Sequence, residues 1–138
     1  MEVFTEEWAA ACRERLNGRG IYAEAGATWE WPVVLVMTAD AAAGVPEARA
    51  VHLELYRGEC RGTRLATGDD EARAPYVLSA SPAGWREILL AGADPVAALM
   101  RGQLKLVRGN LFQMSKQTAA AREMVAAAAD VGGTFPAA

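Results

Sequence analysis

The sequence contains few histidine, cysteine and lysine residues, three types that often take part in catalysis or bind metals. Its 138 residues include one histidine, two cysteines and two lysines, which are His52, Cys12, Cys60, Lys105 and Lys116. The cysteines form no CxxC pair and have no histidine at metal-ligand spacing, so we expect no metal site and no cofactor. Both thiols are expected to be small, buried apolar groups in a reducing interior.

Long apolar runs and strong charge are absent as well. The longest strongly apolar run covers residues 33–37, which is far too short to cross a bilayer. Residues 1–7 are acidic and lack the apolar core of a secretory signal. A formal net charge of −3 without a basic stripe gives no electrostatic reason to expect nucleic acid as a partner. We therefore expect a cytoplasmic protein without stable membrane insertion.

The chain is rich in apolar residues instead. Hydrophobic residues make up 52% of the sequence, which is enough to fill the core of one domain covering residues 1–138. The tail from about residue 131 contains Gly132, Gly133 and Pro136 and is expected to fray.

Apolar spacing predicts a helix and then a buried strand in the first part of the chain. Thr5 or a neighbouring residue is expected to start the helix, which buries a stripe of Trp8, Cys12 and Leu16. A strand at residues 33–38 is apolar on both faces and is therefore expected at the centre of a sheet.

Three further strands are predicted from alternation and turn residues. Residues 51–56 alternate strictly, with Val51, Leu53 and Leu55 facing inward. A tight turn at 57–59 should return the chain as an antiparallel strand at 60–67, and a fourth strand is expected at 75–80. We expect these four strands to form a meander. The intervening segments are predicted as a connecting or partly extended stretch at 21–27, a loop at 40–47 and a polar turn at 68–71.

Two predicted helix starts share the same pattern. Ser81-Pro82 and Asp94-Pro95 each combine a capping side chain with a proline at the first helical position. One face of each helix is apolar, and the residues on these faces are Trp85, Ile88 and Leu89 in the first helix and Val96, Leu99 and Met100 in the second.

The last part of the chain is predicted as a turn, a short strand and a long closing helix. Gly102 ends the preceding helix, and Leu104 and Leu106 then point to one side of the strand. The closing helix begins at about Asn110. The residues along one of its sides are Leu111, Met114, Thr118, Ala121 and Val125.

The evidence for catalytic or cation-binding groups in the sequence is weak. His52 lies beside Glu54 on the polar face of a strand, but no Ser or Cys is placed as its nucleophile, so a surface strand residue is the favoured interpretation. Residues 69–71 are acidic but too short for a calcium loop, which favours a solvated turn. Enzymatic chemistry therefore has no positive evidence. Periodicity alone does not decide whether the apolar faces close on each other or line a cavity, and it slightly favours a filled core.

A family resemblance rests on the run from Asp94 to Asn110, DPVAALMRGQLKLVRGN, preceded by the four predicted strands and Trp85. This pattern resembles the sterol carrier protein 2-type lipid-binding domain over roughly residues 4–129. The resemblance implies an α+β fold in which helices cover a five-stranded, largely antiparallel sheet, with an apolar tunnel between them. It also implies non-covalent binding of fatty acids, acyl-CoAs, sterols or phospholipids. The C-terminal residues 134–138 lack the Ser-Lys-Leu signal, so peroxisomal import is not implied.

The resemblance and the inward strand positions together give a set of candidate ligand-contacting residues. The set is Leu35, Leu53, Leu55, Trp85, Ile88, Leu89, Val96, Leu99, Met100, Leu104, Leu106, Leu111 and Met114. Arg101 or Arg108 is a candidate partner for an acyl carboxylate or a phosphate.

Three hypotheses about function follow. The leading one is non-enzymatic carriage of a lipid or fatty acyl ligand. The second is an interaction module of the same fold with a collapsed cavity, which forms a homodimer or docks on a partner enzyme. The third is an enzyme that uses His52.

Overall fold

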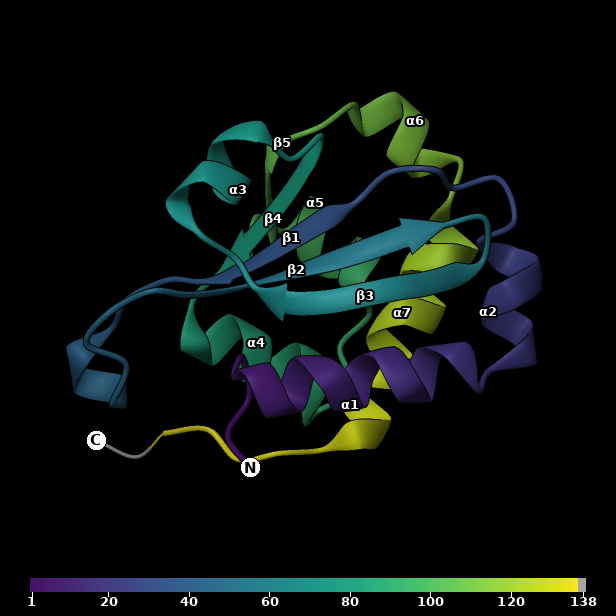
Figure 1. Cartoon of the computed structure of the whole chain (residues 1–138). Coiled ribbons are helices and arrows are strands. Elements are labelled where there is room, and N and C mark those ends of the chain that lie inside the picture. The colour runs from purple at the N-terminus through teal and green to yellow at the C-terminus, as the bar shows by residue number, and fades with distance from the viewer. Residues whose placement is uncertain (137–138) are drawn as a thin grey trace.

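Within residues 1–136, which the computed structural model describes, five strands form one sheet in the order β3-β2-β1-β4-β5 (Figure 1). The strands are β1 (Val33–Met37), β2 (Arg49–Tyr56), β3 (Glu59–Leu65), β4 (Tyr76–Ala80) and β5 (Lys105–Arg108). Neighbouring strands are antiparallel except for β1 and β4, which are parallel. The predicted α+β fold with a largely antiparallel sheet is therefore confirmed.

The central strand β1 has the position that its apolar sequence predicts. All five of its residues are buried, and it pairs with β2 on one side and β4 on the other. The predicted meander is right for β1, β2 and β3 and wrong for β4, which crosses over to the far side of β1 and runs parallel to it. Alternation shows which face of a strand is buried but not which neighbour the strand pairs with, so it could not reveal this crossover.

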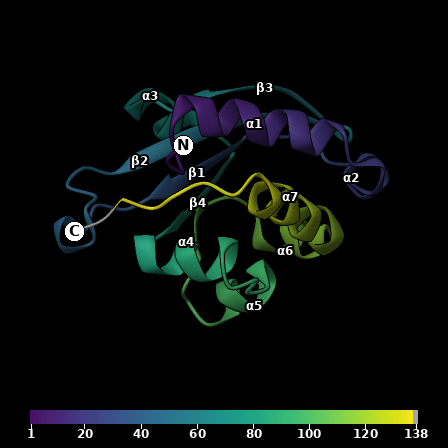
Figure 2. The same cartoon turned by 90° about the horizontal axis from the view of Figure 1, so that it is seen from below.

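Helices cover the two faces of the sheet unequally. They are α1 (Glu6–Asn17), α2 (Gly20–Ala25), α3 (Gly68–Arg73), α4 (Pro82–Leu89), α5 (Pro95–Met100), α6 (Leu111–Ser115), α7 (Thr118–Val131) and the 3₁₀ helix η1 (Ala41–Ala43). The larger core lies on the face that carries Leu35 and Leu78, under α1, α2, α4, α5 and α7 (Figure 2). A smaller core with Val34 and Val77 lies on the other face, next to the end of α3. Within residues 1–136, no helix has the length and apolar character needed to span a membrane.

Three predicted helix starts are confirmed by their caps. The side chains of Thr5, Ser81 and Asp94 each accept a hydrogen bond from the backbone N–H three residues further along the chain. Pro82 and Pro95 occupy the first turns of α4 and α5, where a missing N–H costs nothing. These starts depend on neighbouring residues alone, which makes them readable from the sequence.

Two segments expected to be irregular are helical. The predicted connecting stretch at 21–27 mostly forms α2, which buries only Tyr22, and one buried side chain in six residues gives too little periodicity to identify a helix. The predicted polar turn at 68–71 lies in α3. There Thr67 and Asp70 form a capping box, in which each side chain accepts a hydrogen bond from the other residue's backbone N–H.

The expected long closing helix is divided into α6 and α7. At the break, the N–H groups of Lys116 and Gln117 donate to carbonyls three residues back, at 3.3 and 2.9 Å. This is the tighter winding of a 3₁₀ turn. The Gln117 amide also donates to the Thr28 hydroxyl at 2.8 Å, which ties the break to the segment before β1.

The tail also differs from its prediction. The Val3 N–H donates to the Thr134 carbonyl at 3.0 Å, and the Thr134 N–H donates to the Met1 carbonyl at 2.8 Å. The Trp8 indole N–H donates to the carbonyl of Gly132 at 3.2 Å. The expectation of a frayed tail from residue 131 is therefore wrong up to residue 136, because the N-terminal segment pairs with it (Figure 1). Ala137 and Ala138 lie outside the described residues.

Candidate functional site

An apolar cavity of about 260 Å³ lies between the sheet and the helices that cover it. Leu35 of β1 and Leu78 of β4 border it from the sheet, and Trp85 of α4 borders it from the side. The wall is completed by residues from α5, α6, α7 and the turn before β5, namely Pro95, Val96, Leu99, Met100, Leu104, Leu111, Met114, Ser115, Thr118, Ala121, Met124 and Val125. The slight preference for a filled core is therefore wrong in this part of the molecule.

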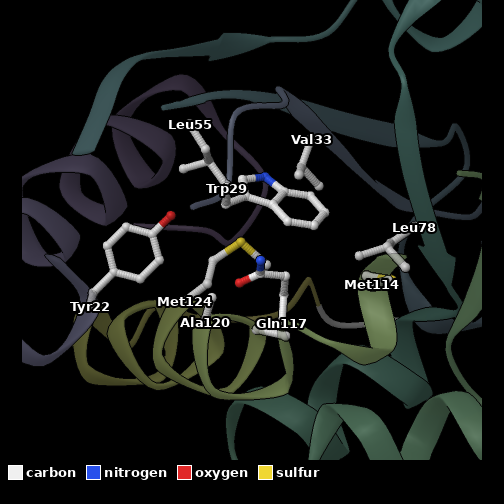
Figure 3. Close-up of a pocket in the computed structure, with 10 residues that line it drawn as sticks. Tyr22, Trp29, Val33, Leu55, Leu78, Met114, Gln117, Ala120 and Met124 are labelled. Atoms are coloured by element: carbon white, nitrogen blue, oxygen red, sulfur yellow. The ribbon is translucent and has the colours of Figure 1, made fainter. Parts of the chain in front are cut away.

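Two small voids of about 30 and 20 Å³ lie next to this cavity. The first is bordered by Tyr22, Trp29 and Leu55 opposite α7 (Figure 3). In this view Met124 reaches from α7 toward Trp29. Met124 borders the main cavity and both voids, so this one flexible side chain separates three spaces.

The wall of the main cavity suits hydrocarbon. Among the described residues that line it, only Ser115 and Thr118 have polar side chains, and none is charged. Arg101 and Arg108, the candidate partners for an acyl carboxylate or a phosphate at the mouth of the site, do not border the cavity itself, and their contact with a head group remains a prediction. Arg108 instead donates to the backbone carbonyls of Glu71 and Ala74, at 2.6 and 3.1 Å.

The cavity opens between α5 and α6. Met100 at the end of α5 is 85% exposed and Leu111 at the start of α6 is 60% exposed, and both border the cavity. Met100 falls on the predicted apolar face of α5, yet it lies at the last residue of a six-residue helix, where nothing covers it. These two side chains therefore form the rim of the cavity.

Eleven of the thirteen candidate contact residues border one or more of the three spaces. Eight border the main cavity, and these are Leu35, Trp85, Val96, Leu99, Met100, Leu104, Leu111 and Met114. Leu55 borders the first void, and Leu53 and Leu89 border the second. Ile88 and Leu106 border none of the three. Their contact with a ligand remains a prediction in every case.

Several lining residues are missing from the predicted set. They are Leu78, Pro95, Ser115, Thr118, Ala121, Met124 and Val125. Thr118, Ala121 and Val125 lie along one side of the predicted closing helix. Helical spacing could therefore have identified these three residues as lining the cavity. No local sequence feature predicts that Leu78 lines the cavity, because its position beside Leu35 depends on the parallel pairing of β1 and β4.

Trp85 holds one end of the cavity in place. It is 2% exposed, and its indole N–H donates to the Val36 carbonyl at 2.8 Å. Its ring centroid lies 5.2 Å from that of Phe4. Trp85 borders both the main cavity and the second void, so it connects core packing to the shape of the site.

The candidate catalytic groups lie away from the cavity or are unreactive. His52 pairs with Val34 on the opposite face of the sheet from Leu35. It is 8% exposed, which corrects the expectation of a surface residue; the short helix α3 and its flanks help to cover this face. Burial raises the pKa of the Cys12 thiol to about 12 and that of Cys60 to about 11. Within residues 1–136, no three His, Cys, Asp or Glu side chains gather to hold a metal.

We expect the stability of the protein to fall when the pH drops from 7.5 to 5.5, in part because of His52. Burial, and then the nearby Arg64, lower the pKa of His52 below its ordinary value of 6.5. In this range the unfolded chain therefore binds more protons than the folded one. The stability that the neutral form of His52 contributes is present above pH 6.5 and is lost as the pH falls below it. Urea unfolding at the two pH values should show a smaller decline in His52→Gln. An equal decline in both proteins would contradict this role. Asp70, whose pKa lies below its ordinary 3.8, does not titrate in this window.

Comparison with known proteins identifies similar structures over nearly the whole chain. A crystal structure of sterol carrier protein 2 shares 40% sequence identity, with a TM-score of 0.86, over 94% of this chain and 98% of that chain. The solution structure of a conserved hypothetical protein from Thermus thermophilus, described as possibly sterol carrier protein, also shares 40% identity. Its TM-score is 0.85, over 97% of this chain and 92% of that one. Sterol carrier protein 2 from Yarrowia lipolytica, in its apo form, has 18% identity and a TM-score of 0.58 over 88% of each chain, which shows a shared fold. No protein-family model and no curated protein matches the chain.

Proposed function

The chain belongs to the sterol carrier protein 2 family, and we propose that it binds a long-chain apolar ligand, such as a fatty acyl chain, without catalysing a reaction on it. The observation that carries the proposal is the cavity of about 260 Å³ with a wall of apolar side chains. Transfer of hydrocarbon from water into such a space is favourable, and the favourable free energy grows with the apolar area removed from water.

The volume of the cavity suggests the length of chain that it holds. An apolar cavity of about 150 Å³ engineered into another protein accepts benzene, which has six carbon atoms. At the same packing, a cavity of about 260 Å³ accepts about ten carbon atoms. Burying ten methylene groups at ~0.8 kcal/mol each contributes roughly 8 kcal/mol, from which the cost of immobilising the ligand is subtracted. Since roughly 8 kcal/mol alone would give a dissociation constant of about 1 μM, we expect the net affinity to be weaker than that.

A charged head group belongs at the rim rather than inside. Burying an unpaired carboxylate is costly, and no charged side chain among the described lining residues offsets that cost. The hydrocarbon tail therefore enters first, with the head group near Met100 and Leu111. The same wall offers no histidine or carboxylate to act as an acid or base, which supports carriage rather than catalysis.

A chain-length series tests the proposal. Saturated fatty acids from six to sixteen carbons would compete with a fluorescent fatty acid for protein purified without detergent. Each added methylene should tighten binding about fourfold, which is the equivalent of ~0.8 kcal/mol. The gain should level off near ten carbons, where the cavity is full. Native mass spectrometry of the same protein should show a bound lipid.

Two results would overturn the proposal. One is a protein that carries no lipid and binds no fluorescent fatty acid, and the other is an affinity that does not change with chain length. The alternative of an interaction module requires a collapsed interior, and the cavity of about 260 Å³ speaks against it.

A further inference from the structure

A groove of about 330 Å³ lies at the ends of β1 and β4 and shares no lining residue with the apolar cavity. Thr38 follows β1 directly, and Ser79 and Ala80 are the last two residues of β4. The wall is completed by the start of α4, the turn before β5 and the first residue of β5, with Ser81, Ala83, Gly84, Gly102, Gln103 and Lys105. None of the described lining residues is acidic, and several carry hydroxyl, amide or ammonium groups. The groove therefore suits a polar or anionic ligand, in contrast to the cavity.

The topology of the sheet explains why a groove forms here. β1 and β4 are parallel, and the next strands along the chain, β2 and β5, lie on opposite sides of this pair. A crevice opens outside the carboxyl ends of two such strands, because the chain leaves them in opposite directions, and ligands of α/β proteins commonly bind there. The first turn of the eight-residue helix α4 borders the groove, so the positive end of its dipole lies beside it.

The first turn of α4 offers a free backbone donor to the groove. The Gly84 N–H donates to the Ser81 hydroxyl at 3.1 Å, which caps the helix. The Ala83 N–H, by contrast, has no hydrogen-bond partner within residues 1–136. Free N–H groups in the first turn of a helix bind phosphate and other anions.

Ser79 supplies an independent indication of a ligand. It is 8% exposed and borders the groove, and its hydroxyl forms no hydrogen bond with any other described residue. Within residues 1–136, every side-chain N or O atom that is fully shielded from water has a partner. The Ser79 hydroxyl must therefore keep some exposure, and it does so through the groove. Because a nearly buried hydroxyl without a partner is costly, this group is available to a bound ligand.

Lys105 adds a full positive charge to the groove. It pairs with Ser79 across β4 and β5, so both side chains lie on the same face of the sheet. Among the described residues, no carboxylate forms an ion pair with Lys105. One carboxylate, that of Glu87, accepts a hydrogen bond from the Gln103 amide, and Glu87 does not itself border the groove. The charge of Lys105 is therefore available to an anion.

We propose that the groove binds a phosphate group, either free or at the end of a small molecule. The Ala83 N–H and the Ser79 hydroxyl donate to phosphate oxygens, and the Lys105 ammonium balances the negative charge. A phosphate monoester carries close to two negative charges at pH 7 and has three strong acceptor oxygens, which matches these three donors. A volume of about 330 Å³ is in the range of small-molecule sites, so the groove has room for the group that carries the phosphate. This second site does not depend on carriage of a fatty acyl chain.

NMR titration of the isotope-labelled full chain at pH 7.5 tests the proposal. Glycerol 3-phosphate should shift the backbone amide signals of Ala83, Gly84 and Lys105 in a saturable way, whereas glycerol should shift none of them. Inorganic phosphate should shift the same signals. Tighter binding of glycerol 3-phosphate than of inorganic phosphate identifies the ligand as a phosphate monoester, and equal or weaker binding identifies it as free phosphate.

Two variants remove the proposed donors one at a time. Lys105→Gln and Ser79→Ala should each weaken phosphate binding about tenfold or more, which is the size expected for a hydrogen bond to a charged group. The free energy of unfolding should not fall in Ser79→Ala, because the hydroxyl has no partner to lose, whereas a structural role would lower it. Lys116→Gln is the matched control, since Lys116 is the only other lysine, is exposed and borders neither the groove nor the cavity. It should bind phosphate as the wild type does.

Three results would overturn the proposal. The first is that neither phosphate compound shifts the signals of the groove, the second is that Lys116→Gln weakens binding as much as Lys105→Gln, and the third is that Ser79→Ala binds phosphate with wild-type affinity. Neither Ser79 nor Lys105 borders the apolar cavity, so fatty acid binding should persist in both variants. Loss of phosphate binding with fatty acid binding retained therefore separates this site from the carrier function.

Discussion

Replacing Ala121 with phenylalanine is expected to weaken the binding of a ten-carbon fatty acid by two to three orders of magnitude. Ala121 on α7 borders both the main cavity and the first void, so a phenyl ring at this position occupies space that the ligand needs. Displacing four or five methylene groups at ~0.8 kcal/mol each removes about 3 to 4 kcal/mol of binding free energy. Competition with a fluorescent fatty acid measures the loss.

Ala119→Phe is the matched control, because Ala119 lies on the same helix and is exposed. Both variants carry the same small cost in helix propensity, roughly 0.5 kcal/mol. The control should bind the fatty acid as the wild type does. The free energy of unfolding of Ala121→Phe should stay within about 1 kcal/mol of the control, since the new ring fills an empty space. If Ala121→Phe folds and still binds with wild-type affinity, the ligand does not occupy this cavity.

The features that were predictable from the sequence are those that neighbouring residues determine. The caps at Thr5, Ser81 and Asp94 are local signals, and each marks a helix start in the structure. The apolar run of β1 indicates burial on both faces, and all of its residues are buried. The capping box between Thr67 and Asp70 was equally local, so α3 could have been recognised as a helix.

The features that were not predictable depend on contacts between distant residues. Periodicity placed Leu78 in a strand but could not place that strand beside β1, so one side of the cavity was missed. At the break between α6 and α7, the Gln117 amide donates to the hydroxyl of Thr28, which lies far away in the sequence. Helical spacing runs through this break without any visible signal.

Small side chains on α7 explain why a cavity remains. The face of α7 toward the sheet carries Ala120 and Ala121, which border the first void, and Ala121 also borders the main cavity. Larger aliphatic residues at these positions would fill the space between the helix and Leu78. Alanine favours the helix and leaves the space open, so the alanine-rich sequence supports both the element and the cavity. The sequence shows the alanines, but only the fold shows that they face an unfilled volume.

The largest expected loss of stability comes from Trp85→Ala. Trp85 is 2% exposed and packs against Phe4. Truncating a buried tryptophan costs about 3 to 5 kcal/mol of unfolding free energy, through lost burial and the space left behind. Here the cost should lie near the upper end, because the indole N–H also donates to the Val36 carbonyl at 2.8 Å. Urea unfolding at pH 7.5 measures the change.

Trp85→Phe separates the hydrogen bond from the packing. It keeps an aromatic ring near Phe4 and leaves the Val36 carbonyl without its indole partner, so it should cost about 1 to 2 kcal/mol. A loss of less than about 1 kcal/mol in Trp85→Ala would mean that the core collapses onto the space. Without such collapse, the main cavity and the second void merge, since Trp85 borders both. The chain length at which fatty acid affinity levels off should then exceed that of the wild type, and an unchanged plateau would show that the ligand does not reach this end of the cavity.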